Sequence, residues 1–205
     1  MTPRVVVVVV VVAVVGAGAL LAGPASPSGT AVADIGAAIG RAQAALSSSK
    51  GRDWPAVIAA LSEGLRLARA EAPLQITRAV VVDGPHTGLG VYAPSANGMV
   101  RDRRLRLYVE VENLSARPLS DGRSELSLDV TGHFSTVASD GSLEALGKKS
   151  LGAQQVQTFR PIGVHSFGVD VALGLDAPAG AYVVELEVID RVGGKSARLA
   201  VPFAL

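Results

Sequence analysis

The hydrophobic pattern of the chain changes its period near Leu74. Between Asp34 and about Ala70, apolar residues recur every three to four positions, which places them on one face of a helix. The stretch Ser47–Gly51 interrupts this pattern. The sequence therefore predicts two helices joined by a short connection, which is an antiparallel helical hairpin over residues 34–72.

The second helix of this hairpin has recognisable boundaries. Asp53 is placed to cap its first turn, Pro55 is tolerated within that turn, and Pro73 ends the helix. Its apolar stripe is large, and we expect it to be buried against the domain that follows. The stripe consists of Trp54, Val57, Ile58, Leu61, Leu65 and Ala68.

After Leu74, apolar and polar residues alternate with a period of two. This alternation is typical of strands that have one buried and one exposed face. The regular rows begin at Leu105, Leu126, Phe167, Tyr182 and Ala197. Less regular candidate strands cover residues 76–82, 89–93, 143–149 and 156–160.

Turn dipeptides such as Asp83-Gly84 and Asp140-Gly141 separate these candidate strands. No helical pattern lies between them, so parallel β-α-β units are not expected. The predicted fold class is α+β. It consists of an N-terminal helical hairpin and an antiparallel immunoglobulin-like β-sandwich of about seven to nine strands over residues 73–205.

The first 33 residues have the layout of a secretory signal peptide. Arg4 precedes an apolar run from Val5 to Ala22, and Ala31-Val32-Ala33 forms a cleavage site before Asp34. We therefore expect residues 1–33 to be removed and the protein to reach the periplasm or the extracellular space. The alternative is an uncleaved membrane anchor, because the run is close to the minimum length of a spanning helix.

Composition narrows the range of functions. The chain has 19 Lys and Arg against 18 Asp and Glu, and Arg4 is the only charge in the signal segment, so the mature protein would be neutral. A neutral chain has no general attraction to nucleic acid, and we expect no nucleic-acid partner. The chain has no cysteine, so its stability has to come from a packed core and not from disulfides.

Candidate chemistry is sparse. His86, His133 and His165 are the three histidines, and no pair of them has metal-ligand spacing. We predict no catalytic, metal or cofactor residues, and therefore no cofactor. The alternative is a hydrolase with a site at the junction between hairpin and sandwich, where the loop that carries His86 could face the hairpin.

The most interesting surface is one side of the strand that begins at Leu105. Its polar positions are predicted to be exposed and to bind a partner, and they are Arg106, Tyr108, Glu110 and Glu112. If the next strand paired with this one, Glu125, Ser127 and Asp129 would extend the same surface. Arg101, Arg103 and Arg104 form a basic cluster with Arg106, which is either a solvated turn and strand edge or a contact for an anionic polymer.

The end of the chain carries a resemblance. Residues 175–182 form a corner with Pro178 and Gly180, Tyr182 opens an alternating strand, and a glycine turn at 193–194 leads to the last strand. This resembles the final hairpin of immunoglobulin-like and fibronectin type III-like sandwiches in exported bacterial proteins, including those that join a short helical hairpin to such a sandwich. The resemblance implies that the Tyr182 hydroxyl bonds to nearby backbone.

These observations favour an exported, non-catalytic binding or scaffolding module. We expect its partner to be another envelope protein or a cell-surface polymer, and the membrane only if the signal segment is retained. A carbohydrate-binding module is a further alternative, which few aromatic residues support: the chain has one Trp, three Tyr and four Phe.

Overall fold

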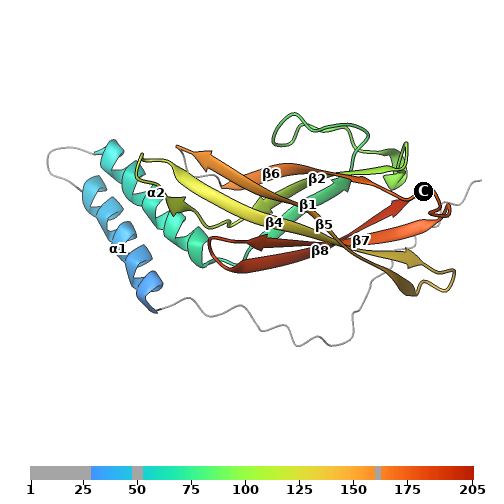
Figure 1. Cartoon of the computed structure of the whole chain (residues 1–205). Helices are drawn as coiled ribbons and strands as arrows, with labels where there is room; N and C mark the ends of the chain where they lie inside the picture. Colours follow the sequence, from blue (N-terminus) through green and yellow to red (C-terminus); the bar gives the residue numbers. More distant parts are fainter. Residues whose placement is uncertain (1–28, 48–52, 160–162) are drawn as a thin grey trace, which may run out of the picture.

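The computed structural model describes residues 29–47, 53–159 and 163–205. Its architecture is α+β: two helices come first, and the remaining described chain forms two antiparallel sheets (Figure 1). This confirms the predicted fold class at that level. We call residues 73–205 the β-region. The apolar run from Val5 to Ala22 and the connection at 48–52 lie outside the described residues.

The helical hairpin is present as predicted. It consists of α1 (Gly29–Leu46) and α2 (Trp54–Glu71). Asp53 caps α2, because its Oδ1 accepts a hydrogen bond of 3.1 Å from the backbone N–H of Ala56. Helix α1 begins before Asp34 and so runs across the expected cleavage position, and removal of residues 1–33 stays a prediction. Within the described ranges, neither helix has the length and hydropathy of a membrane span.

Small side chains form the seam between the two helices. Ala38, Ala42, Val57 and Ala60 are buried there, together with Gly64. A Cβ added at Gly64 would lie 3.4 Å from the Cβ of Ala38, so the two backbones approach closely at this point. Larger residues therefore have no room in the seam.

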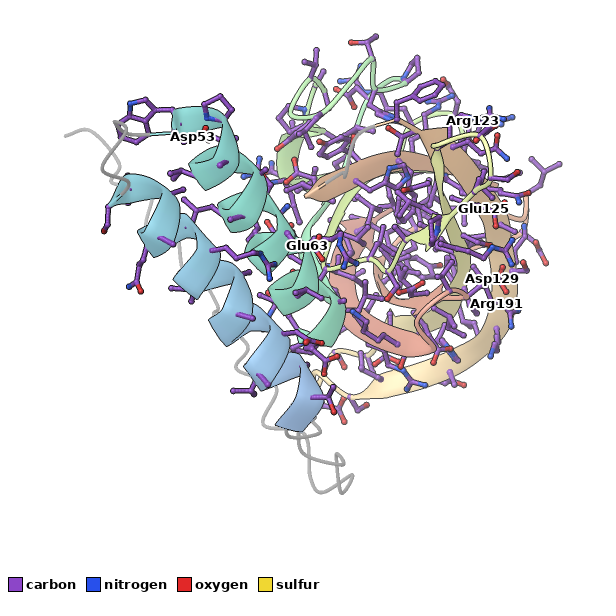
Figure 2. All side chains as sticks on the ribbon, turned by 90° about the vertical axis from the view of Figure 1, so that its left-hand side faces the viewer. Asp53, Glu63, Arg123, Glu125, Asp129 and Arg191 are labelled. Carbon is purple, nitrogen blue, oxygen red and sulfur yellow. The ribbon has the colours of Figure 1, made fainter. Side chains whose placement is uncertain are left out.

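The large residues of the α2 stripe are exposed apart from Val57, which is buried in the seam, and the prediction of their burial is wrong. Trp54, Ile58, Leu61 and Leu65 are between 50% and 62% exposed. The physical reason is that the small residues occupy the seam, while the β-region meets the hairpin near the end of α2. Figure 2 shows α2 between α1 and the sheets.

The β-region contains two sheets. The three-stranded sheet has the order β1-β2-β6, with β1 (Gln75–Val81), β2 (Arg104–Glu112) and β6 (Val164–Ala172). The five-stranded sheet has the path β3-β4-β7-β8, and β5 also pairs with β4. Its strands are β3 (Arg117–Pro118), β4 (Ser124–Val137), β5 (Leu143–Thr158), β7 (Ala181–Asp190) and β8 (Lys195–Ala204).

Of the less regular candidate strands, some are confirmed and one is wrong. Residues 76–82 correspond to β1, but residues 89–93 belong to a loop. Residues 143–149 and the described part of 156–160 fall on the single long strand β5 or its end. The period breaks within β5 because register shifts occur beside Gly147 and Gly152, whose φ values are 144° and 121°.

Both sheets contribute to one hydrophobic core. Leu105, Leu107 and Val109 of β2 are at most 1% exposed, as are Val184 and Leu186 of β7. These are the inward positions that the period of two predicted. At the start of β7, the Tyr182 hydroxyl donates a hydrogen bond of 2.6 Å to the carbonyl of Pro178, and this confirms the expected bond.

Lys195 bonds the β-region to the end of the hairpin. The Nζ of Lys195 donates hydrogen bonds to the carbonyls of Arg69 (3.2 Å), Ala72 (3.0 Å) and Asn113 (2.8 Å). Carbonyls at the end of a helix have no partner within it, so this ammonium group both caps α2 and fixes its direction. Burial at the junction lowers the pKa of Lys195.

Candidate functional site

The polar side of β2 lies next to polar residues of its two neighbours. Strand alternation places Arg106, Tyr108, Glu110 and Glu112 on one side, as predicted from the sequence. The register sets Asp170, Gly168 and Ser166 of β6 opposite the first three of these. On the other edge, Val80 and Arg78 of β1 lie opposite Tyr108 and Glu110.

Tyr108 is fully buried, and its expected exposure is wrong. The loop between β1 and β2 folds over it: the ring of Tyr92 stacks on the ring of Tyr108 at 4.3 Å between centroids. The backbone N–H of Gly90 donates to the Tyr108 hydroxyl at 2.6 Å, and this hydroxyl donates to Glu110 Oε1 at 2.7 Å. Burial raises the pKa of Tyr108.

The rest of the row is half-buried. Arg106 lies 3.6 Å from Asp170, and Glu110 lies 3.9 Å from Arg78. The guanidinium of Arg78 also donates to the Tyr92 hydroxyl at 2.7 Å, which fixes the loop from its other side. Tyr108 and Glu110 therefore help to hold a loop in place, and partner binding by this row stays a prediction.

His86 belongs to the same loop and lies over Gly168. A Cβ at Gly168 would be 2.8 Å from His86 Nδ1, so a glycine is needed beneath this ring. The ring also contacts Tyr108 edge-on at 5.5 Å. A cavity of about 420 Å³ lies beside it, lined by residues that include Arg106 and Asp170. Its described lining comes from the β-region alone, so the structure gives no support to the expectation that His86 faces the hairpin.

The other two histidines lie elsewhere. His133 is on the five-stranded sheet, where its Nε2 is 3.5 Å from Glu187. His165 of β6 lies 3.3 Å from Gln154 of β5 and stacks on Phe167. Burial, and secondarily the charge of His86, lower the pKa of His165. Among the described residues, no group of three His, Cys, Asp or Glu is placed to hold a metal ion.

The possible extension of the β2 surface does not form. Glu125, Ser127 and Asp129 lie on β4, which belongs to the other sheet and pairs with β3, β5 and β7. Arg117 bonds to Glu125, and Arg191 bonds to Asp129; Figure 2 labels Glu125, Asp129 and Arg191 along one edge of the β-region. Glu125, Ser127 and the two arginines border a separate polar hollow of about 540 Å³.

The basic cluster before β2 is largely used in structural contacts. Arg103 donates to the carbonyls of Gly174 and Ala177 at 2.9 Å each, which ties its turn to the loop before β7. Arg104 lies 3.0 Å from Asp170, and Arg101 lies 3.6 Å from Asp83. With these carboxylates and carbonyls beside them, the arginines do not form a free anion-binding patch.

The tip of the loop over Tyr108 is apolar and exposed. Leu89 is 56% exposed and Val91 is 58% exposed, on either side of the pinned Gly90. This feature was not predicted from the sequence, because the pattern of residues 89–93 indicated a strand. The two glycines of Gly88-Leu89-Gly90 were the available indication of a tight turn. Gly90 has a φ of 72°, which glycine adopts readily and which turns often require.

Comparisons with known proteins do not identify a family. No family model matches the chain, and no curated protein matches it. A solved alkylpurine DNA glycosylase, AlkC of Pseudomonas fluorescens, is 17% identical with a TM-score of 0.36, covering 73% of this chain and 37% of its own. For a family 123 glycoside hydrolase from Clostridium perfringens the identity is 12%, the TM-score 0.36, and the coverage 65% and 27%. A DUF4466 family protein from Parabacteroides merdae is 11% identical with a TM-score of 0.34, and the match covers 65% of this chain and 45% of that protein.

The chain spans less than half the length of each of these three structures. Their low TM-scores carry no functional argument for this protein, and the case for function rests on its own residues.

Proposed function

We propose that this protein is an exported, non-catalytic binding or scaffolding module of the periplasm or cell surface. The proposal of export rests on the signal-peptide pattern of residues 1–33. An immunoglobulin-like arrangement of the β-region is part of the proposal. Two antiparallel sheets around one core and the hydroxyl bond of Tyr182 support it.

The observation that carries the binding role is the pinned loop tip. Leu89 and Val91 project apolar side chains into solvent, while the backbone between them is bonded to the buried Tyr108 hydroxyl. A loop that is already ordered loses little conformational entropy when a partner binds, so more of its contact energy appears as affinity. Exposed apolar residues on a rigid scaffold are typical of protein-binding sites.

The polar surroundings fit the same role. Arg106 and Asp170 border the cavity at the foot of the loop, and both remain partly exposed. A central apolar contact with a polar rim is the usual anatomy of a protein interface. We therefore propose another envelope protein as the partner, bound through Leu89 and Val91 with Arg106 at the rim.

A photo-crosslinking residue at Leu89 tests this proposal in the native envelope. The expected result is one discrete crosslinked product, which Val91→Ser reduces about tenfold, as for loss of a contact in the centre of an interface. Tyr108→Phe keeps the ring but removes the hydroxyl that holds Gly90, and it should reduce crosslinking to a lesser extent. The matched control is Leu175→Ser, since Leu175 is 88% exposed in a different loop.

The hydrolase alternative makes the opposite prediction. His86 contacts Tyr108 and lies over Gly168, and among the described residues it makes no hydrogen bond to a hydroxyl or carboxylate. If His86→Gln abolished the cellular role while crosslinking through Leu89 continued, the proposal of a non-catalytic module would be wrong. An equal loss of Leu89 crosslinking in Leu175→Ser and Val91→Ser would also contradict it.

A further inference from the structure

The helical hairpin has a second apolar feature, which the loop-tip proposal does not use. Each helix carries a row of large, exposed aliphatic or aromatic residues. In α1 the row follows a seven-residue spacing, and in α2 it follows spacings of four, three and four. We call these two rows together the hairpin face: Val32, Ile39 and Leu46 with Trp54, Ile58, Leu61 and Leu65.

Helix geometry puts both rows on the same side of the hairpin. The helices are antiparallel, because Ala38 meets Gly64 while the N–H of Asp53 bonds to the carbonyl of Ala45. Successive residues of a helix are about 100° apart around its axis. Viewed from the N-terminus of each helix, the exposed row lies roughly 80–100° around the axis from the buried seam residues, and the direction of this rotation is the same in both helices. Equal rotations in antiparallel helices turn both rows toward one side, so the rows are neighbours.

Polar residues occupy the other side. The same geometry places Asp34, Arg41 and Glu63 roughly 140–170° away from the rows of their helices. The hairpin is therefore amphipathic, and the large side chains of its apolar side are exposed. Each helix has 18 residues and is about 27 Å long and 10 Å wide, so the hairpin face measures roughly 500 Å².

The area of the hairpin face can be compared with the areas of protein interfaces. Patches on soluble monomers reach about 300–600 Å², and the larger ones usually mark interaction sites. Stable interfaces begin at about 600 Å² from each partner. Side-chain relief adds to the flat estimate, so the hairpin face is large enough for a modest protein interface without help from the β-region.

Charge distinguishes a protein partner from a lipid surface. Helices that lie on anionic membranes are rich in Lys and Arg beside their apolar face. Here α1 and α2 carry three basic residues (Arg41, Arg66 and Arg69) and three acidic ones (Asp34, Glu63 and Glu71). This balance gives no attraction to anionic headgroups. A row that itself carries no charge meets no repulsion from an identical row, so the face is complementary to itself.

We propose that the hairpin face binds the same face of a second copy of this chain, so that two hairpins form a four-helix bundle. Two-fold symmetry brings each row against a row of the other copy, and Trp54, Ile58, Leu61 and Leu65 become core residues. Burial of these side chains would then come from the second copy and not from the β-region. The interface is separate from the loop tip, and either could fail without the other.

Introduced cysteines test this arrangement in the full chain, which has none of its own. Single variants Ile39→Cys, Ile58→Cys, Leu61→Cys and Leu65→Cys would be expressed in cells and oxidised, and dimers would be counted on non-reducing gels. Residues near the two-fold axis come within the Cα separation of about 7 Å that a disulfide tolerates, so at least one of them should crosslink strongly.

The matched control is Ala59→Cys, an exposed position of α2 about 130° from the hairpin face. It should give less than about a tenth of the dimer obtained at the strongest position of the face, because a disulfide requires the specific geometry of the bundle. A charged variant, Leu61→Glu with Leu65→Glu, should abolish the crosslink at Ile58→Cys. Both substitutions are at exposed sites, so circular dichroism should show an unchanged fold.

Three outcomes would overturn the proposal. One is the absence of crosslinking from every position of the hairpin face. Another is equal crosslinking at Ala59→Cys, which would indicate random collision or pairing through another segment. The third is protection of Leu61→Cys from a water-soluble maleimide only after phosphatidylglycerol vesicles are added, which would assign the face to a lipid surface.

Discussion

The helical hairpin and the β-region distribute large and small apolar residues in opposite ways. In the β-region, large residues such as Leu107 and Leu186 are buried between the two sheets. In the hairpin, Ala38 and Gly64 are inside, while Ile58 and Leu65 are outside. The comparison shows that a hydrophobic stripe predicts which residues share a face, but not which face its neighbours cover.

The energetic consequence is a difference in how much each region stabilises itself. Full burial of a leucine contributes roughly 1.5–3 kcal/mol, and the β-region collects this from residues of both sheets. The buried hairpin cluster consists of Ala42, Val57 and Ala60, so it gains much less. We therefore expect the hairpin to depend on its attachments: the junction at Lys195 and, as proposed, a second copy.

The largest expected effect contrasts one leucine from each region. Leu186→Ala should lower the free energy of unfolding by about 2–5 kcal/mol, because it leaves a cavity in the shared core. Leu65→Ala should change it by no more than about 0.5 kcal/mol at concentrations low enough for the monomer, because that side chain is half exposed. Urea unfolding at several protein concentrations measures both values, and a larger loss for Leu65→Ala in the dilute protein would break the comparison.

The sequence predicted most of the fold for physical reasons that differ between the regions. In the β-region, rows such as Leu105 to Val111 have only one apolar side, so strand alternation determines the buried face. In the hairpin, α2 has two apolar sides, a small one at Ala60 and Gly64 and a large one at Leu61 and Leu65. Periodicity does not rank them, and close approach at Gly64 decides the outcome.

The candidate site was harder to predict, because a loop covers it. Alternation placed Tyr108 correctly on the polar side of β2, yet nothing in the local pattern shows that the chain returns over it. The fold of the loop depends on the bond from Gly90 N–H to the Tyr108 hydroxyl, 18 positions apart. Contacts of this kind come from tertiary structure, as does the capping of α2 by Lys195.

The second prediction weakens the junction between the two regions. Lys195→Met removes an ammonium group from three carbonyls while keeping much of the aliphatic side chain, and should cost about 1–3 kcal/mol. The loss should appear first as faster amide hydrogen exchange in the last turn of α2. Lys148→Met is the control, since Lys148 is exposed and only 3.8 Å from Glu187. Similar exchange in both variants would show that the junction does not depend on Lys195.

The third prediction concerns the corner of β7, within the self-stabilised region. Tyr182→Phe keeps the ring, which stacks on Phe203 at 5.3 Å, and removes the hydroxyl that bonds to Pro178. Stability should fall by about 0.5–1.5 kcal/mol, with no change in hydrogen exchange in the hairpin. Tyr92→Phe, whose hydroxyl bonds to the exposed Arg78, should cost less in the same denaturation experiment. Equal losses would mean that burial of the Tyr182 bond contributes nothing extra.

The smallest expected effect is a pH dependence that originates in the β-region. Burial between β5 and β6 lowers the pKa of His165 below its usual 6.5, so the unfolded chain takes up this proton at a higher pH than the folded protein does. Below pH 6.5 the unfolded state therefore binds more protons than the folded state. The free energy of unfolding decreases as the pH is lowered, until the histidine of the folded protein is protonated as well. His165→Gln retains a polar partner for Gln154 and has nothing to protonate. Urea midpoints measured from pH 8 to pH 5 should fall less in this variant than in the parent protein, and an unchanged slope would show that acid destabilisation has another origin.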